Sequence, residues 1–267
     1  VYCIYKTIIS CFTEDGGFME RLIQAENIVK RFRDKKQQVL AVDHVSLHLD
    51  EGEILGIIGE SGSGKSTILR LLSGIIQPDE GQVTLFGKSL DTKDRSRFRN
   101  LQMIFQDARA SFDKQYTIEQ SLDEIRKHLN PSALENRFLL QEVGLDTSFA
   151  KKYPYEMSGG ECQRAAIARA FACDPKVLLC DEITSALDVI TQERICSLLT
   201  HLCHQHHISA IFVSHDLPLV SNLCDRVMIM KDGRVVEEGR TKDVMQNPQH
   251  PYTKELLRHI LKLETAE

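Results

Sequence analysis

The sequence predicts an α/β fold: an α/β core around a buried strand–loop–helix unit, an antiparallel β subdomain and a helical insertion subdomain. Three short apolar runs are typical of strands that are covered on both faces of a sheet: residues 54–58, 177–180 and 210–213. Residues 44–49 and 82–86 alternate between apolar and polar side chains, as strands with one solvated face do. Residues 107–175 instead show the three- and four-residue spacing of helices.

The first third of the chain is expected to consist mainly of strands. Residues 21–29 should form the first strand, followed by a polar loop at 33–38 and a second strand at 44–49. A turn at 50–53 leads into the buried strand at 54–58. The next expected elements are a helix at 65–73, closed by Gly74, and a strand at 82–86.

The α/β pattern returns after the helical stretch. The expected elements are a strand at 177–180, a helix at 191–205, a strand at 210–213, and a hairpin of strands at 227–230 and 235–237. A turn at 247–251 then separates two helices, at 243–246 and 253–263.

These patterns indicate one domain preceded by a short extension. The expected parts are an α/β core with its β subdomain at 19–106 and 176–240, a helical subdomain at 107–175, and a C-terminal helical tail at 241–267. Residues 1–18 are interpreted as an N-terminal extension that is disordered or non-native, and in the second case Met19 would be the true start.

Composition narrows the function classes. The chain is 42% hydrophobic and 27% charged, which is typical of a folded globular protein. A net charge of -5 provides no overall basic field, so a nucleic-acid partner is not expected. The eight cysteines form no C-x-x-C pair and are interpreted as small core residues of a reducing compartment. Because no apolar run reaches the roughly 18–20 residues that span a bilayer, work at a membrane would need another chain to cross it.

A phosphate-binding loop is predicted between the buried strand at 54–58 and the helix that follows. The segment matches G-x-x-x-x-G-K-[ST] and reads Gly59, Glu60, Ser61, Gly62, Ser63, Gly64, Lys65, Ser66 and Thr67. Glycines let backbone N–H groups turn inward around phosphates, and the helix N-terminus adds positive charge there. Lys65 can reach the β- and γ-phosphates, while the Ser66 hydroxyl can ligate Mg²⁺.

Two acidic residues end the apolar strand at 177–180. Ligands gather at the carboxyl ends of strands in such sheets, which places Asp181 and Glu182 near the phosphate loop. Asp181 would then face Mg²⁺, and Glu182 would polarise the attacking water. The alternative is a solvated strand end that happens to be acidic.

A second glycine-rich helix start follows at Ser158, Gly159 and Gly160. One nucleotide needs a single phosphate cradle, so this helix start either completes the site of a second, head-to-tail subunit or is an ordinary helix cap. The residues themselves leave both readings open.

The motifs and their order resemble the nucleotide-binding subunit of an ABC transporter, over residues 22–263. Met157-Ser158-Gly159-Gly160-Glu161 is similar to the family's L-S-G-G-Q signature. The resemblance implies a P-loop NTPase (RecA-like) core, hydrolysis of ATP with Mg²⁺, and a head-to-tail dimer. By the same resemblance, Phe32 stacks on adenine, Gln106 senses Mg²⁺ and the γ-phosphate, Asp188 lies in a loop that crosses the dimer interface, and His215 is the switch histidine.

The resemblance assigns each site residue a role. The catalytic residues would be Glu182, His215, Lys65 and Gln106. Nucleotide would be held by Phe32, Gln106, residues 59–67, Ser158, Gly159, Gly160 and Asp188, and the metal by Ser66, Gln106 and Asp181. Four positions depart from the family pattern: Met157, Glu161, Ile183 and Ala108. None removes a catalytic group, but the Glu161 charge would weaken the half-site that this chain offers its partner.

The tail segment Asn247-Pro248-Gln249-His250-Pro251-Tyr252-Thr253 resembles the oligopeptide, dipeptide and nickel importer branch, as do residues 102–107. This likeness implies an ATPase subunit on the cytoplasmic face of the membrane. Its partners would be permease subunits, a second ATP-binding subunit and, indirectly, a substrate-binding protein. The alternatives are a regulatory half of a heterodimer with little hydrolysis of its own, or a soluble ABC ATPase without a transport role.

Overall fold

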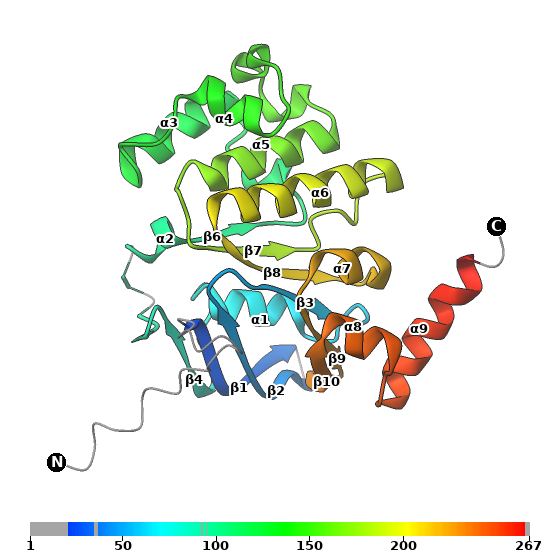
Figure 1. Ribbon diagram of the computed structural model, residues 1–267. Coiled ribbons are helices and arrows are strands. Elements are labelled where there is room, and N and C mark those ends of the chain that lie inside the picture. Colours follow the sequence, from blue (N-terminus) through cyan, green and yellow to red (C-terminus); the bar gives the residue numbers. More distant parts are fainter. Residues whose placement is uncertain (1–20, 35–36, 92, 95, 265–267) are drawn as a thin grey trace, which may run out of the picture.

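The computed structural model describes residues 21–34, 37–91, 93–94 and 96–264. Residues 1–18, expected to be an extension, lie outside the described residues. Two sheets organise the chain: a four-stranded sheet in the order β2-β1-β4-β5 and a six-stranded sheet in the order β10-β9-β3-β8-β7-β6. Helix α1 (Lys65–Leu72) lies between them, and helices α5 and α6 cover the other face of the larger sheet (Figure 1).

The smaller sheet is antiparallel. Its strands are β1 (Arg21–Asp34), β2 (Gln37–Asp50), β4 (Glu80–Leu85) and β5 (Lys88–Ser89). The loop predicted at 33–38 is wrong at its two ends, because Arg33 pairs with Gln38 and Asp34 pairs with Gln37. Backbone pairing continues past the apolar part of the hairpin, and the polar side chains there give no alternating pattern from which to predict it.

The larger sheet carries the predicted buried strands. β3 (Ile54–Ile58), β6 (Leu101–Ile104), β7 (Val177–Asp181), β8 (Ser209–Ser214) and β9 (Arg226–Lys231) run parallel, and β10 (Arg234–Arg240) pairs antiparallel with β9. The hairpin expected from 227–237 is therefore confirmed. All five residues of β3 and of β7 are buried, as the apolar runs predict.

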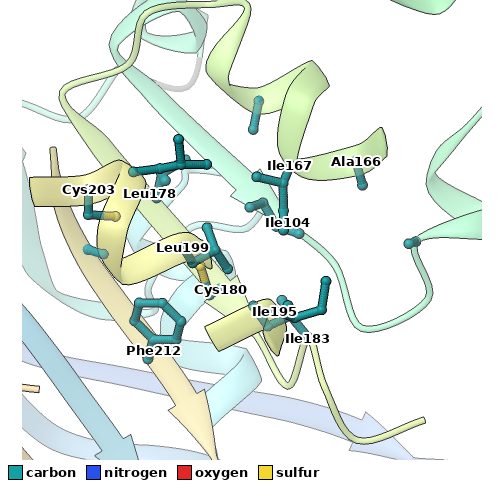
Figure 2. Close-up of a cluster of buried hydrophobic side chains, with 14 of the residues drawn as sticks. Ile104, Ala166, Ile167, Leu178, Cys180, Ile183, Ile195, Leu199, Cys203 and Phe212 are labelled. Atoms are coloured by element: carbon teal, nitrogen blue, oxygen red, sulfur yellow. The ribbon is translucent and has the colours of Figure 1, made fainter. Parts of the chain in front are cut away.

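Alternate side chains of β7 enter two different hydrophobic clusters. Leu178 and Cys180 pack with α5 (Gly159–Phe171) and α6 (Val189–His206), the cluster drawn in Figure 2. Val177 and Leu179 point to the opposite face and pack with α1 and the antiparallel sheet. Because the strand is buried on both faces, its carboxyl end is held rigidly at the site described below.

Helices occupy the chain between β6 and β7. They are η1 (Arg109–Ser111), α3 (Ile118–His128), α4 (Asn136–Glu142), η2 (Thr147–Lys151), η3 (Pro154–Glu156) and α5, after a short α2 (Arg97–Asn100) that precedes β6. A capping box between Thr117 and Gln120 starts α3. Leu134 and Phe138, which belong to the apolar spacing, are 48% and 45% exposed, so only part of that pattern marks the core.

The remaining helices follow β8 and β10. They are α7 (Leu217–Leu223), α8 (Thr241–Gln246) and α9 (Pro251–Glu264). In the part of the chain that the structure describes, no helix combines the length and apolar character that a bilayer crossing requires. Six cysteines are buried and unpaired, as predicted for core residues: Cys162, Cys173, Cys180, Cys196, Cys203 and Cys224.

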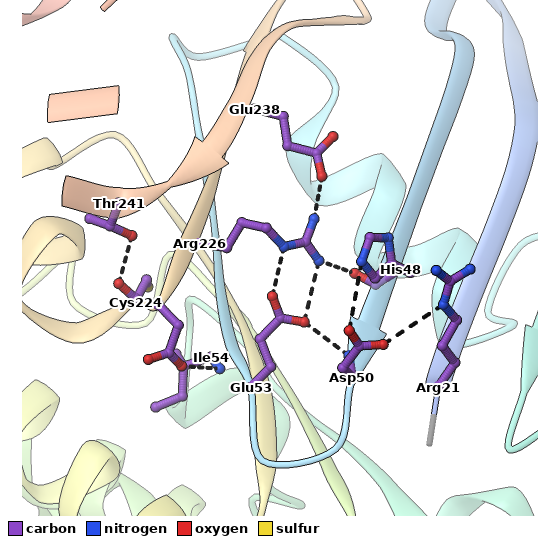
Figure 3. Close-up of polar contacts among 10 residues, drawn as sticks. Arg21, His48, Asp50, Glu53, Ile54, Cys224, Arg226, Glu238 and Thr241 are labelled. Atoms are coloured by element: carbon purple, nitrogen blue, oxygen red, sulfur yellow. Dashed lines mark hydrogen bonds and ion pairs between the residues drawn. The ribbon is translucent and has the colours of Figure 1, made fainter. Parts of the chain in front are cut away.

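A charged network fixes the entry to β3 (Figure 3). Arg226 of β9 donates to Glu53 Oε1 at 2.7 Å and to the His48 carbonyl at 2.7 Å, and it also binds Glu238. The neighbouring Asp225 carboxylate accepts the Ile54 N–H at 2.9 Å. These bonds tie β9 and β2 to the start of β3, which leads directly into the phosphate loop.

Candidate nucleotide-binding site

The predicted phosphate loop connects β3 to α1, and its glycines are required by close backbone approaches. A Cβ on Gly59 would lie 2.3 Å from the Met230 carbonyl oxygen, and one on Gly64, at φ 102, would lie 2.2 Å from the Ala41 carbonyl oxygen. Gly62, at φ 84, instead has no atom within 4 Å of such a Cβ. The loop is therefore packed against neighbouring strands at both ends and open at its tip.

Lys65 lies inside the loop and is only 4% exposed. Its Nζ donates to the carbonyls of Gly59 (2.7 Å) and Glu60 (2.8 Å) and lies 3.7 Å from Glu182 Oε1. Burial lowers the pKa of Lys65, against the opposing pull of the Glu182 carboxylate. The two loop carbonyls thus hold the Lys65 ammonium inside the loop, and the oxygens of a bound phosphate could take their place as its hydrogen-bond acceptors.

Ser66 and Asp181 form a polar pair beside the lysine. The Ser66 hydroxyl donates to Asp181 Oδ1 at 2.7 Å, and Asp181 is 7% exposed. Burial raises the pKa of Asp181, while the Ser66 hydrogen bond acts in the opposite direction. Both groups offer oxygen, the donor that Mg²⁺ prefers.

Glu182 follows β7 in a left-handed backbone conformation, with φ 45. Its N–H donates to the Val213 carbonyl of β8 at 3.1 Å, which anchors the turn. His215 follows β8, is 59% exposed, and places Nδ1 3.9 Å from Glu182 Oε2. The carboxyl ends of β3, β7 and β8 therefore bring Lys65, Glu182 and His215 into one cluster. The strand-end argument predicts the position of Glu182 near the phosphate loop, whereas His215 was proposed from the resemblance.

Gln106 reaches this cluster through a serine. Its Nε2 donates to Ser185 Oγ at 2.9 Å, and Ser185 Oγ donates to the Glu182 carbonyl at 3.0 Å. The sequence analysis assigns no role to Ser185 itself. The structure makes it the link between the end of β6 and the end of β7.

Phe32 is placed differently from the other candidates. It lies on β1 opposite Val39, is 39% exposed, and has the Lys30 Nζ 5.8 Å from its ring centroid. The described contacts place its ring beside Lys30. Its stacking on adenine stays a prediction.

The second glycine-rich helix start has a well-formed cap. The Ser158 N–H donates to Glu161 Oε2 at 2.8 Å, and the Glu161 N–H donates to Ser158 Oγ at 3.3 Å. The backbone hydrogen bond from Ser158 lowers the pKa of Glu161. A Cβ on Gly160 would approach Thr191 Cγ2 to 2.8 Å, so packing on α6 alone already requires a small residue there.

Asp188 caps the neighbouring helix. Its carboxylate accepts the Thr191 N–H at 3.0 Å and the Thr191 hydroxyl at 2.7 Å. Within the described part of the chain, no hydrogen bond or ion pair joins residues 158–160 or Asp188 to residues 59–67. Ser158, Gly159 and Asp188 are exposed, which leaves them accessible to a second molecule.

Three of the four departures from the family pattern are core positions. Met157, Ile183 and Ala108 are 3%, 4% and 6% exposed and belong to the cluster that contains Leu178. They fill apolar space and contribute no polar group. Glu161 alone changes the charge of a surface.

One contact at the loop was not predicted. The Tyr252 hydroxyl of α9 accepts a hydrogen bond from the Glu60 N–H at 3.3 Å. The sequence analysis identifies the segment at 247–253 only by its resemblance to the oligopeptide, dipeptide and nickel importer branch. The spacing of its residues gives no sign that Tyr252 would contact the phosphate loop.

Comparison with known proteins shows the family of this chain. The family model described as "ABC transporter" matches residues 42–185. The oligopeptide transport ATP-binding protein OppF of Salmonella typhimurium is 41% identical over 227 residues, which cover 81% of this chain and 68% of that protein. The methionine import ATP-binding protein MetN of Staphylococcus saprophyticus is 39% identical over 249 residues, covering 90% and 72%.

A solved structure shares the architecture. The dimeric post-hydrolysis state of the ATP-binding cassette MJ0796, bound to ADP and Pi, superimposes with a TM-score of 0.72 at 30% identity and covers 82% of this chain and 98% of that one. The predicted P-loop NTPase fold is therefore confirmed. The chain belongs to the ABC transporter family and is one of its ATP-binding, ATP-hydrolysing subunits.

Proposed function

We propose that this chain powers an ABC importer of peptides or of nickel or other metal chelates, using ATP held at residues 59–67 and hydrolysed with Glu182 as base. The observation that carries the proposal is the cluster of Lys65, Glu182 and His215 at the ends of three parallel strands. The similar OppF protein is named for oligopeptide transport, which supports a peptide cargo, and the similar MetN protein is named for methionine import, which supports an import role.

The phosphate loop is suited to bind the triphosphate. Its tip at Gly62 is open, and the partial positive charge of the α1 N-terminus favours anions there. Lys65 would exchange its two carbonyl partners for phosphate oxygens, which offer its charge a stronger hydrogen bond than a neutral carbonyl does.

The site fits Mg²⁺ by the chemistry of its donors. Among the described residues, no group of three or more His, Cys, Asp and Glu side chains could hold a metal by itself, so the bound nucleotide would have to contribute ligands. Ser66, Asp181 and the side-chain oxygen of Gln106 would hold the ion together with oxygens of the bound phosphates. When bound, the ion neutralises charge on the phosphates. The Ser66–Asp181 bond keeps both groups aligned for it.

Hydrolysis requires a base and a group that steadies the γ-phosphate. Glu182 is held by its backbone bond to Val213, so its carboxylate has a fixed position from which to orient water. His215 lies beside it and can hold the γ-phosphate. Gln106 is connected to the Glu182 backbone through Ser185, so movement of the chain after β6 reaches the base.

A second subunit would complete the site. Ser158 and Asp188 are exposed and, among the described residues, make no hydrogen bond to this chain's own phosphate loop, which leaves them and Gly160 available to a nucleotide held by a partner. Val189 and Ile190, directly after Asp188, are 78% and 63% exposed, which leaves apolar surface there for a partner. The MJ0796 cassette is described as a dimer, which supports this arrangement.

Permease subunits would dock on a groove beside β6. Exposed apolar side chains at Ile75, Phe98 and Phe105 line this cavity of about 360 Å³, which Arg169 and Asp113 border. The segment at 107–116 would move with the helical subdomain and push a permease helix. This docking would put the chain at the cytoplasmic face of the membrane, with a substrate-binding protein acting indirectly through the permease.

Reconstitution with candidate permease chains tests this function. Vesicles that contain them should take up peptide or chelated nickel when ATP and this chain are supplied, and uptake should stop with Glu182→Gln. Hydrolysis that no permease, substrate or binding protein alters would instead favour an ABC ATPase without a transport role.

A further inference from the structure

We propose that Tyr252 is a positioning residue for the phosphate loop, which it holds through the hydrogen bond from the Glu60 N–H to its hydroxyl at 3.3 Å. The inference rests on the proposed role of residues 59–67 and adds a residue from the far end of the chain. Tyr252 does not touch nucleotide in this account. It acts through the backbone of Glu60.

The segment before Tyr252 is fixed by a carboxylate. Glu237 Oε1 accepts the Gln249 N–H at 2.7 Å, and Glu237 Oε2 accepts the His250 N–H at 3.0 Å. The His250 Nδ1 then accepts the Tyr252 N–H at 3.2 Å. Strand β10 thereby fixes the start of α9 and sets the direction in which Tyr252 leaves the helix.

Tyr252 is buried in a defined environment. It is 4% exposed, and the Lys231 Nζ lies 4.5 Å from its ring centroid. Burial raises the pKa of the phenol, against the opposing hydrogen bond from the Glu60 backbone. The hydroxyl is therefore neutral at physiological pH and remains able to accept the Glu60 N–H.

The peptide group between Gly59 and Glu60 is held from both of its sides. Its carbonyl, that of Gly59, accepts Lys65 Nζ at 2.7 Å, while its N–H, that of Glu60, donates to Tyr252. Lys65 must give up the carbonyl when it binds a phosphate, so one restraint is lost as nucleotide arrives. The Tyr252 bond lies on the opposite side of the peptide and can persist through that exchange.

The neighbouring residues show why this restraint matters. Gly59 already packs on the Met230 carbonyl, and the Gly233 N–H donates to the Ser63 carbonyl at 3.1 Å. Glu60 lies between these two anchored points. Without the Tyr252 hydroxyl, the loop must be ordered by the nucleotide itself, which costs binding free energy.

The test compares three variants of the full chain by equilibrium titration with a fluorescent ATP analogue. Tyr252→Phe removes the hydroxyl and keeps the ring under Lys231. Tyr155→Phe, at a residue that is 63% exposed, is the matched control. Lys65→Ala tests the loop itself. We expect Tyr252→Phe to raise Kd roughly three- to tenfold, the value of one lost hydrogen bond, with the control unchanged.

Turnover separates positioning from a merely structural role. Tyr252→Phe should raise KM for ATP by the same factor and leave kcat at saturating ATP within about twofold, because the base is untouched. An unchanged Kd in Tyr252→Phe, alongside lost binding in Lys65→Ala, would overturn this inference and leave the proposed function intact. A lower melting temperature with unchanged Kd would overturn it too. Unchanged binding in Lys65→Ala would contradict the proposed function instead.

Discussion

Lys65 Nζ lies 3.7 Å from Glu182 Oε1, which brings together two residues from the ends of different strands. The loop after β3 leads to Lys65 at the start of α1, and Glu182 directly follows β7, with β8 between these two strands in the sheet. The ammonium partly neutralises a carboxylate that is 19% exposed. An incoming phosphate would draw Lys65 toward itself and leave Glu182 free to orient water, so binding and activation are linked at one contact.

Lys65→Ala should lose ATP affinity by at least about tenfold, because a charge-assisted hydrogen bond to phosphate is removed. Isothermal titration with MgATP measures the loss. Lys88→Ala, on the exposed strand β5, is the matched control and should bind normally. Equal affinity in all three proteins would contradict the assignment of the loop.

Asp181→Asn should separate stability from metal binding. Burial raises the folded-state pKa of Asp181, so the native state holds more protons than the unfolded state between the ordinary value of 3.8 and the raised one. Stability therefore falls as pH rises through this window, and the cost persists at neutral pH. The neutral amide avoids this cost.

We accordingly expect nucleotide-free Asp181→Asn to melt at or above the wild-type temperature at pH 7.5, with a much smaller rise on adding MgATP. Scanning calorimetry with and without ligand measures both. The proposed role of Asp181 would be wrong if MgATP stabilised both proteins equally.

Glu161→Gln should strengthen ATP-dependent pairing of subunits. The amide oxygen can still accept the Ser158 N–H, so the helix cap remains, while a negative charge near the partner's phosphates is removed. The expected gain in dimer affinity is about two- to fivefold and should shrink at high salt. Sedimentation of Glu182→Gln protein with and without the added change measures it, and weaker pairing would refute the repulsion.

The six buried thiols should be unreactive in the native protein. Burial raises the pKa of Cys173, Cys196 and Cys203 to about 12, which leaves almost no thiolate at pH 8. A Cys3→Ser, Cys11→Ser double variant isolates these six. An aromatic disulfide reagent should label them only after guanidinium unfolds the chain, and rapid labelling of the folded variant would count against the core.

The sequence predicts best the elements whose environment is uniform along their length. The runs at 54–58 and 177–180 are apolar throughout because both faces of β3 and β7 are covered. Strand β6 was not predicted. Its residues Gln102 and Met103 are only half-buried at the edge of the sheet, so the strand has no continuous apolar run. Helix α7 was not predicted because it is too short to show a clear apolar spacing. Asp216 as N-cap and Pro218 in the first turn are both signals of a helix start that could have indicated it.

The candidate site likewise contains residues that the sequence predicts and one that it does not. Lys65, Ser66, Asp181 and Glu182 follow buried strands, so strand-end reasoning places them together. Tyr252 could not be found by such reasoning, because its partner is a backbone N–H 192 positions away. A side chain that supports a loop through the backbone carries no residue pattern of its own.

The rate of phosphate release by Glu182→Gln, measured beside its ATP affinity, tests the central claim most directly. If Glu182 orients the attacking water, the variant should keep wild-type affinity, accumulate as an ATP-bound dimer and lose at least about a hundredfold in turnover. Wild-type phosphate release by this variant would contradict the account.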